Sequence, residues 1–181
     1  MTTFTIDPAH TDVLFSAKLM MVTTVRGKFT DVSGTIDVNE ADPTASKAEI
    51  RVRAASLDTG FGARDTHLRS NDFFGAETYP EIRVMSTAVR AKGRNDYAVT
   101  ADVTIRDVTR SVDFAVEFLG FFTGMDGVRH AGFNAKATVN RKDWNLNWNV
   151  ALETGGWLVG DTIKLEVEVA IIESAKVAVA A

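Results

Sequence analysis

The chain has 181 residues, of which 45% are hydrophobic, so it fits one globular domain and is not intrinsically disordered. Its formal net charge of −4 excludes the broad attraction of basic proteins for nucleic acid, and no nucleic-acid partner is expected. It contains no cysteine, which excludes disulfides and thiolate metal sites.

Alternation of apolar and polar residues with period two predicts β-strands along most of the chain. In chain order, the predicted strands are residues 13–19, 34–38, 50–52, 97–105, 112–118, 133–139 and 163–171. The clearest is residues 97–105, where every second residue from Tyr97 to Ile105 is apolar and these residues share one face. Short turn clusters such as NEADP and KGRND separate the strands and favour an antiparallel sheet.

One short helix is predicted near residues 63–71, in the stretch ARDTHLRSNDFF. Asp65 and Arg69 are spaced i, i+4, and Arg69 and Asp72 i, i+3, which predicts ion pairs on a solvated helix surface. A helix this short needs packing to be stable. We expect Leu68, Phe73 and Phe74 to anchor this helix, which would then lie as a lid against the mouth of the sheet structure. Pro80 disfavours helix at Tyr79, so the next strand is expected to begin at about Glu81.

One short helix cannot cover the apolar face of seven or more strands. The face must be buried in a sandwich of two sheets or in a closed barrel, and the periodicity does not choose between them. Small residues occupy several inward positions, namely Ala17, Ala54, Ala101, Gly132, Ala135 and Ala137. They could leave a hollow interior or could match bulky neighbours across a filled core, and the pattern favours neither.

The sequence shows little that would support catalysis. His10, His67 and His130 are isolated from one another, so no metal site is expected. No serine stands in a G-x-S-x-G motif, and no glycine-rich phosphate loop is present. Trp144 and Trp148 lie four residues apart beside charged residues, which suits either the rim of an apolar site or a packed barrel end.

Five segments in order resemble the YceI-like family of bacterial lipid-binding proteins. They are IDPAHTDVLFSAKLMMVTTVRGKF, GFGARDTHLRSNDFF followed by YPEI, VTIRDVTRSVDF, GFNAKATVNRKDWNL and VGDTIKLEVEV. The resemblance implies an all-β fold: a closed antiparallel lipocalin-like barrel of about eight strands. It further implies an apolar tunnel that holds a long isoprenoid or another amphiphilic lipid. No cofactor is expected beyond a bound isoprenoid or quinone-like lipid.

The sequence departs from the family pattern at three positions. Leu19 stands where relatives often carry His, which makes the expected interior more apolar. Asp107 and Asn145 replace glycines at turns, where Asp and Asn tolerate the same backbone conformations. Family members are commonly exported to the periplasm, but this chain shows no signal peptide and no apolar run of the roughly 18 residues that a membrane span requires. A cytoplasmic protein is therefore expected.

The leading hypothesis is a lipid-binding barrel, not an enzyme. The candidate ligand-binding residues are Phe15, Leu19, Phe29, Ile36, Val99, Val103, Ile105, Phe114, Val116, Phe133 and Val167 in the wall, and Leu68, Phe73, Phe74 and Tyr79 at the lid. A polar head group would need donors at the mouth, for which Arg141, Arg110 and His67 are the candidates.

Three alternatives stay open. An enzyme acting on an apolar substrate would use His67 with Asp65 or Asp72 as acid and base. A filled barrel would serve as a scaffold for a protein partner, and Phe73 and Phe74 could instead contact a second subunit in a homodimer.

Residues 1–174 are expected to form the single domain, and residues 175–181 a frayed tail.

Overall fold

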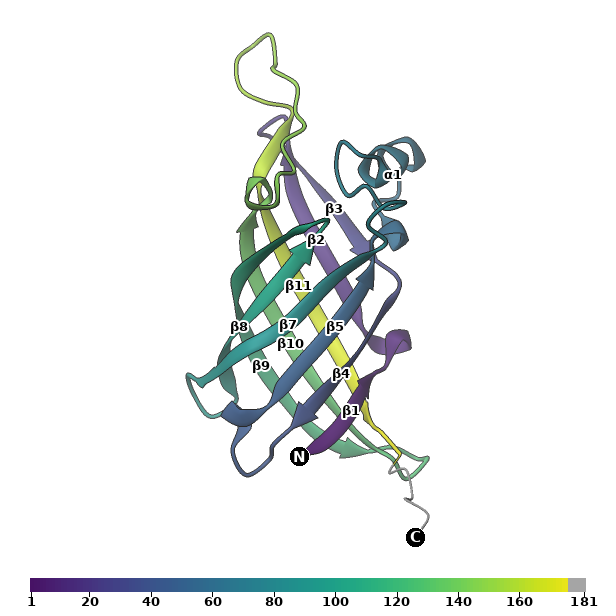
Figure 1. The fold of residues 1–181 in the computed structure, drawn as a ribbon, viewed down its shortest axis with the longest axis vertical. Helices are drawn as coiled ribbons and strands as arrows, with labels where there is room; N and C mark the ends of the chain where they lie inside the picture. The colour runs from purple at the N-terminus through teal and green to yellow at the C-terminus, as the bar shows by residue number, and fades with distance from the viewer. Residues whose placement is uncertain (176–181) are drawn as a thin grey trace.

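The computed structural model describes residues 1–175, and more than half of the described chain lies in one antiparallel sheet (Figure 1). The strands are β1 (Thr2–Ile6), β2 (Asp12–Leu19), β3 (Thr23–Phe29), β4 (Val32–Val38), β5 (Lys47–Arg53), β6 (Leu57–Asp58), β7 (Glu81–Ala91), β8 (Asp96–Ile105), β9 (Val108–Thr123), β10 (Arg129–Asn140) and β11 (Val159–Glu173). Within residues 1–175 there is one α-helix, α1 (Gly62–Arg69), besides four short 3-10 turns. The prediction for residues 175–181 falls almost wholly outside the described residues.

The sheet closes into a barrel because β11 pairs with both β1 and β2. Phe4 to Ile6 of β1 pair with the end of β11 near Glu173, and β2 pairs with its other half. β1 and β2 are thus successive halves of one long strand, and the same holds for β3 with β4 and for β5 with β6. These three pairs and the five strands β7 to β11 give eight positions around the barrel. The structure therefore confirms the closed barrel of about eight strands.

Short 3-10 turns make the breaks between some of these half-strands. Between β1 and β2, Pro8–His10 forms a turn that begins at Asp7, whose carboxylate accepts from the amide of Ala9 at 3.0 Å. Between β5 and β6, Ala54–Ser56 forms another, and Ala54 is buried there. Such breaks let a long strand change direction and follow the curved wall of the barrel.

Helix α1 lies at the upper end of the barrel in Figure 1, beside β3. The predicted ion pairs on its surface are wrong. Asp65 is buried and accepts a hydrogen bond from the amide of Thr59 at 3.0 Å, while Arg69 donates to the carbonyl oxygens of Ala55 at 2.9 Å and Leu57 at 2.8 Å. The charges bind the preceding backbone instead of one another: Thr59 lies just after β6, and Ala55 lies in the 3-10 turn just before it.

The expected anchoring of the helix is confirmed. Phe73 is buried, and the ring of Phe74 meets that of Phe29 edge-on at 5.7 Å between centroids. The strand after Pro80 begins at Glu81, as predicted. In residues 1–175, no helix is long and apolar enough to cross a membrane.

Candidate ligand-binding chambers

The barrel encloses two apolar cavities that meet at its waist. The upper chamber, at the end that carries α1, has a volume of about 510 Å³, and the lower chamber, beside the loop between β4 and β5, has about 350 Å³. Five residues line both chambers: Val13, Val52, Val84, Phe114 and Val167. The volumes lie in the range of small-molecule sites, and the five shared residues stand where the two chambers adjoin. An eight-stranded barrel is just wide enough for such a space.

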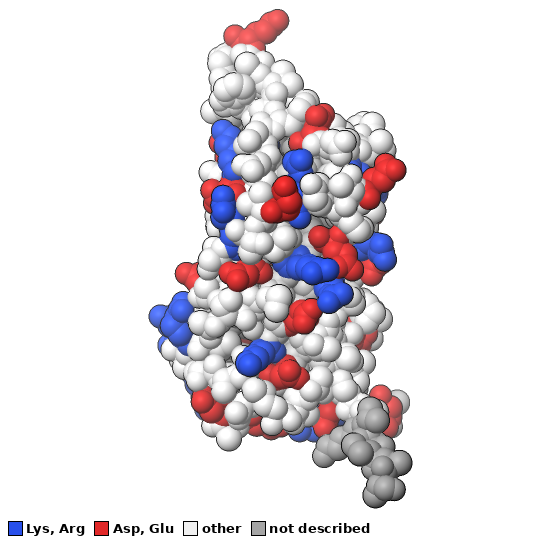
Figure 2. All heavy atoms as spheres, viewed as in Figure 1, with Lys and Arg blue, Asp and Glu red and all other residues white. Residues whose placement is uncertain are grey.

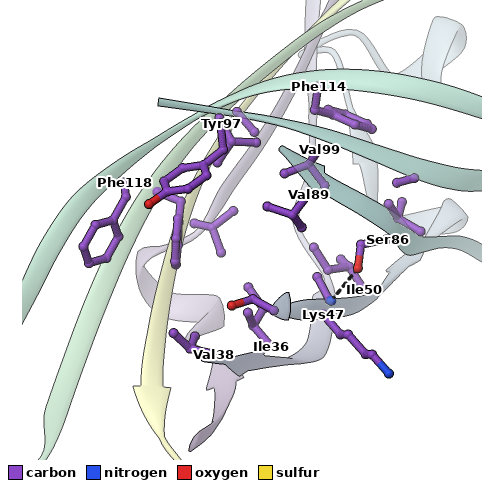
Figure 3. Close-up of a pocket in the computed structure, with 18 of the residues that line it drawn as sticks. Ile36, Val38, Lys47, Ile50, Ser86, Val89, Tyr97, Val99, Phe114 and Phe118 are labelled. Atoms are coloured by element: carbon purple, nitrogen blue, oxygen red, sulfur yellow. Dashed lines mark hydrogen bonds between the residues drawn. The ribbon is translucent and has the colours of Figure 1, made fainter. Parts of the chain in front are cut away.

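The lower chamber is apolar on nearly all sides (Figure 3). Ile36, Val38 and Ile50 face Val99 and Phe114 across it. One of its few polar groups is the hydroxyl of Ser86, which accepts from the amide of Ala48 at 2.8 Å. Ser86 stands at a register shift between β7 and β8, and its side chain takes the place of a backbone acceptor for β5. Tyr97 supplies the phenol group of the same wall.

The far end of the lower chamber is lined by aromatic rings. Phe118 contacts Phe133 at 5.3 Å and Phe121 at 5.0 Å between centroids, and all three rings line the chamber. The guanidinium of Arg129 lies over the ring of Phe121, 4.5 Å from its centroid, and donates to Glu40 at 2.8 Å. Glu40 belongs to the loop between β4 and β5, so this ion pair joins two sides of the lower rim.

The upper chamber is covered in part by α1 and by the segment that follows β10 (residues 141–158). The ring of His67 meets Trp148 edge-on at 4.4 Å, and Trp148 contacts Phe73 at 5.5 Å between centroids. Trp144 is buried in the same wall and donates from Nε1 to the carbonyl oxygen of Val103 at 2.9 Å. The two tryptophans thus serve both roles left open from the sequence, since Trp144 packs the barrel end and Trp148 lines the chamber under the lid.

Most of the candidate ligand-binding residues line these chambers. The upper chamber is lined by Phe15, Leu19, Phe29, His67, Leu68, Phe73, Phe74, Val103, Ile105 and Arg141, and the lower by Ile36, Val99, Val116 and Phe133; Phe114 and Val167 line both. Ala17 lines the upper chamber, and Ala101 and Ala135 the lower. These three residues therefore border open space, whereas Ala54, Gly132 and Ala137 line neither chamber.

Two candidates lie elsewhere. Tyr79 stacks beside the guanidinium of Arg106, 5.9 Å from it, and lines neither chamber. Arg110 is exposed on β9 and donates to the carbonyl oxygen of Asp143 at 2.9 Å. Alternation would place Arg110 on the inward face with Val112 and Phe114, but it stands near the start of β9, where its guanidinium turns to the carbonyl oxygen of Asp143.

Arg141 lines the upper chamber, but its donors bind the protein itself. It donates to the carbonyl oxygens of Leu146 at 2.6 Å, Trp148 at 2.9 Å and Gly160 at 3.0 Å, with Asp161 3.5 Å away. Burial lowers the pKa of the Arg141 guanidinium from its ordinary value, and the charge of Asp161 opposes that change. Arg141 thus fastens the segment after β10 and leaves little donor capacity for a head group.

His67 and Asp72 are brought together, whereas Asp65 is not. Nε2 of His67 lies 2.9 Å from Oδ2 of Asp72, while the carboxylate of Asp65 faces Thr59. The His67 side chain is 37% exposed, at the rim of the upper chamber. In the described residues, no three His, Asp or Glu side chains gather as a metal ion would require.

Sequence reasoning missed the wall that β7 contributes. Ile82 and Val84 line the upper chamber, and Ser86 and Val89 the lower. The register shift between Ser86 and Ala88 moves the inward face by one residue, so strict alternation fails there.

The two positions where this chain replaces a family glycine differ in backbone conformation. Asn145 is left-handed, with φ 60°. At the turn that holds Asp107, the left-handed residue is instead Arg106, with φ 57°.

The chain is similar in sequence and in fold to known proteins. Residues 4–171 match the family model described as YceI-like domain. A UPF0312 protein of Staphylococcus epidermidis is 37% identical over 167 residues, covering 92% of this chain and 95% of that protein. The solved structure of Burkholderia cenocepacia BcnA is similar, with a TM-score of 0.78 and 22% identity, covering 91% of this chain and 98% of BcnA.

A further solved structure shares the fold at low sequence identity. It is a polyisoprenoid binding domain from Saccharophagus degradans implicated in plant cell wall breakdown. The TM-score is 0.71 at 14% identity, and the match covers 96% of this chain and 100% of that domain.

Proposed function

Because this chain belongs to the YceI-like domain family, we propose that its two joined chambers hold the chain of an isoprenoid or another long amphiphilic lipid. The observation that carries the proposal is that the two chambers adjoin at a waist of five shared apolar residues, four of them valines. Two apolar chambers placed end to end suit one extended chain better than two separate small ligands. The likeness in fold to a polyisoprenoid binding domain supports the same ligand class.

The energetics favour a long apolar chain. Each CH₂ group removed from water contributes about 0.8 kcal/mol, so affinity grows with the length of chain that the chambers enclose. Open apolar space costs stability when it stays empty, because its lining side chains lack partners. A bound chain supplies those partners. Polar groups of the chambers such as Ser86 and Arg141 already bind the protein's own backbone. The chambers should therefore select a lipid by the length and apolar character of its chain.

The His67–Asp72 pair is the observation that favours the rival function of an enzyme. A histidine held by a carboxylate at the rim of an apolar cavity is suited to proton transfer. The ring of His67 also meets Phe73 and Trp148 edge-on, at 5.1 Å and 4.4 Å between centroids. We assign the pair to this packing, in which Asp72 orients the ring that joins α1 to the segment after β10.

A titration of delipidated protein with isoprenoid alcohols of increasing length tests the proposal. Trp148 lines the upper chamber, so its fluorescence should change as the chain enters. Affinity should rise with each added isoprene unit until the chambers are full and then level off. An affinity that does not depend on chain length would contradict the proposal.

A further inference from the structure

Exposed apolar side chains gather at the upper end of the molecule, outside both chambers. They form the apolar tip: Met20, Met21 and Val22 from the hairpin between β2 and β3, and Val150 and Trp157 from the segment after β10. Their exposed fractions run from 45% at Val150 to 79% at Val22. Figure 1 shows both segments at the top of the molecule, and in Figure 2 this end is uncharged except for acidic atoms at its extreme point.

The two parts of the tip are fastened to each other. The amide of Met20 donates to the carbonyl oxygen of Leu158 at 2.7 Å, and the amide of Leu158 donates to Val150 at 2.9 Å. The sulfur of Met21 lies against Gly156, which has no side chain to displace it. Between Leu19 and Val25 the sequence has no charged residue, and between Trp144 and Gly160 it has one, Glu153. The apolar tip is therefore one contiguous patch, held in place by backbone hydrogen bonds, and not a set of separate exposed side chains.

Basic side chains lie directly below the apolar tip. Lys18 points outward on β2, and Arg26 on β3 and Lys164 on β11 flank Ser16 one row further down. All three side chains are exposed, and none forms an ion pair with another described residue. The nearby carboxylate of Asp161 is engaged by Lys142 at 3.3 Å. Lys18, Arg26 and Lys164 form the basic belt.

We propose that the apolar tip and the basic belt together dock on the surface of an anionic phospholipid bilayer. Methionine, valine and tryptophan side chains enter the interface between head groups and acyl chains, and cations just behind them contact lipid phosphates. Each lysine or arginine near an anionic surface strengthens such binding by about fivefold. Since the whole chain carries a net charge of −4, the local positive charge of the belt favours binding through this face and so sets the orientation.

The docking surface is continuous with the upper chamber. Leu19 and Leu158 line that chamber, and their chain neighbours Met20 and Trp157 belong to the apolar tip. Docking there would place the chamber mouth at the bilayer, so that an apolar chain could move between the two without crossing water. The inference goes beyond the proposed function, because the tip residues, Arg26 and Lys164 line neither chamber and can bind a bilayer whatever the chambers hold.

Co-sedimentation of the purified protein with vesicles tests the inference. Binding is expected to vesicles of phosphatidylcholine mixed with phosphatidylglycerol, and much less binding to vesicles of phosphatidylcholine alone. Val22→Asp in the tip and Arg26→Glu in the belt should each weaken binding to the mixed vesicles by about tenfold or more. Both positions are exposed, so the fold should persist, which the melting temperature verifies.

Matched control variants lie away from the tip. Met125→Asp changes a fully exposed methionine in the hairpin between β9 and β10, and Arg94→Glu changes an exposed arginine between β7 and β8. Neither should alter vesicle binding. The inference is overturned if the mixed vesicles do not bind the protein, or if the controls weaken binding as much as the tip and belt variants. It is also overturned if Val22→Asp only converts a dimer to a monomer in sedimentation, since the tip would then be a contact between subunits. Lipid content, measured separately, reports on the chambers alone.

Discussion

Arg141 donates a hydrogen bond from Nη1 to the carbonyl oxygen of Leu146 at 2.6 Å in the interior of the protein. The same nitrogen donates to Trp148, so the guanidinium holds the segment that walls the upper chamber. Arg141→Met should leave these buried carbonyls without partners and lower the free energy of unfolding by about 2 to 5 kcal/mol. Denaturation in urea measures the loss.

The neighbouring Lys142 provides the matched control. It is exposed and pairs with Asp161, so Lys142→Met should change the free energy of unfolding by about 1 kcal/mol or less. An Arg141→Met protein that unfolds like the wild type but binds different lipids would show that Arg141 recognises a head group instead of fastening the wall.

Filling the lower chamber should displace the ligand. Ala135 of β10 lines this chamber, and Ala135→Phe puts a ring into the open space. The variant should fold, because the ring enters space that the protein does not itself fill, and it should lose most bound lipid by mass spectrometry. Ala115 of β9 is exposed in the neighbouring row, so Ala115→Phe is the control and should keep its lipid. Equal lipid in both variants would exclude the lower chamber as part of the site.

The contrast between β8 and β3 shows what the sequence could predict. On β8, residues from Tyr97 to Ile105 alternate without interruption, and the structure places this face toward the chambers. On β3, the inward position Gly27 carries no side chain, because the ring of Phe15 fills the space where its Cβ would stand. Alternation is lost there, and the strand was not predicted. The reason lies in a contact between two strands, which no local pattern contains.

The candidate site was predictable to a similar extent. Inward apolar residues were found wherever alternation was regular, but the polar candidates depended on partners that only the fold supplies. Arg141 turned out to bind carbonyls from a segment that follows it in the chain, and Arg110 to lie on the outside. Whether small residues leave a hollow is likewise decided across the barrel and not along the strand.

Narrowing the waist should shorten the lipid that is held. Val167 lines both chambers, so Val167→Phe should separate them while leaving each in place. Lipids extracted from this variant should have shorter chains than those from the wild type. The control is Glu166→Phe, which changes the adjacent outward residue of β11 and should leave chain length unaltered. An unchanged length distribution in Val167→Phe would mean that the ligand occupies only one chamber.

Removing the His67 ring separates binding from catalysis. His67→Ala should keep its lipid, and loss of the contacts with Phe73 and Trp148 should lower the free energy of unfolding by about 1 to 3 kcal/mol. His10 offers a matched pair at the surface, since its Nδ1 lies 2.7 Å from Asp7 and its side chain is 77% exposed. His10→Ala should cost less than His67→Ala. If the wild type converts an apolar substrate, and His67→Ala loses this activity while it still binds lipid and His10→Ala stays active, the enzyme hypothesis would be supported.

The two chambers of the purified protein should hold an apolar chain that does not belong to the protein. Organic extraction of the purified protein, followed by mass spectrometry, tests it most directly. We expect about one long-chain lipid for each protein molecule, since two adjoining chambers suit one chain. Protein that is folded yet yields no stoichiometric lipid, and that takes up none when mixed with isoprenoids, would contradict it.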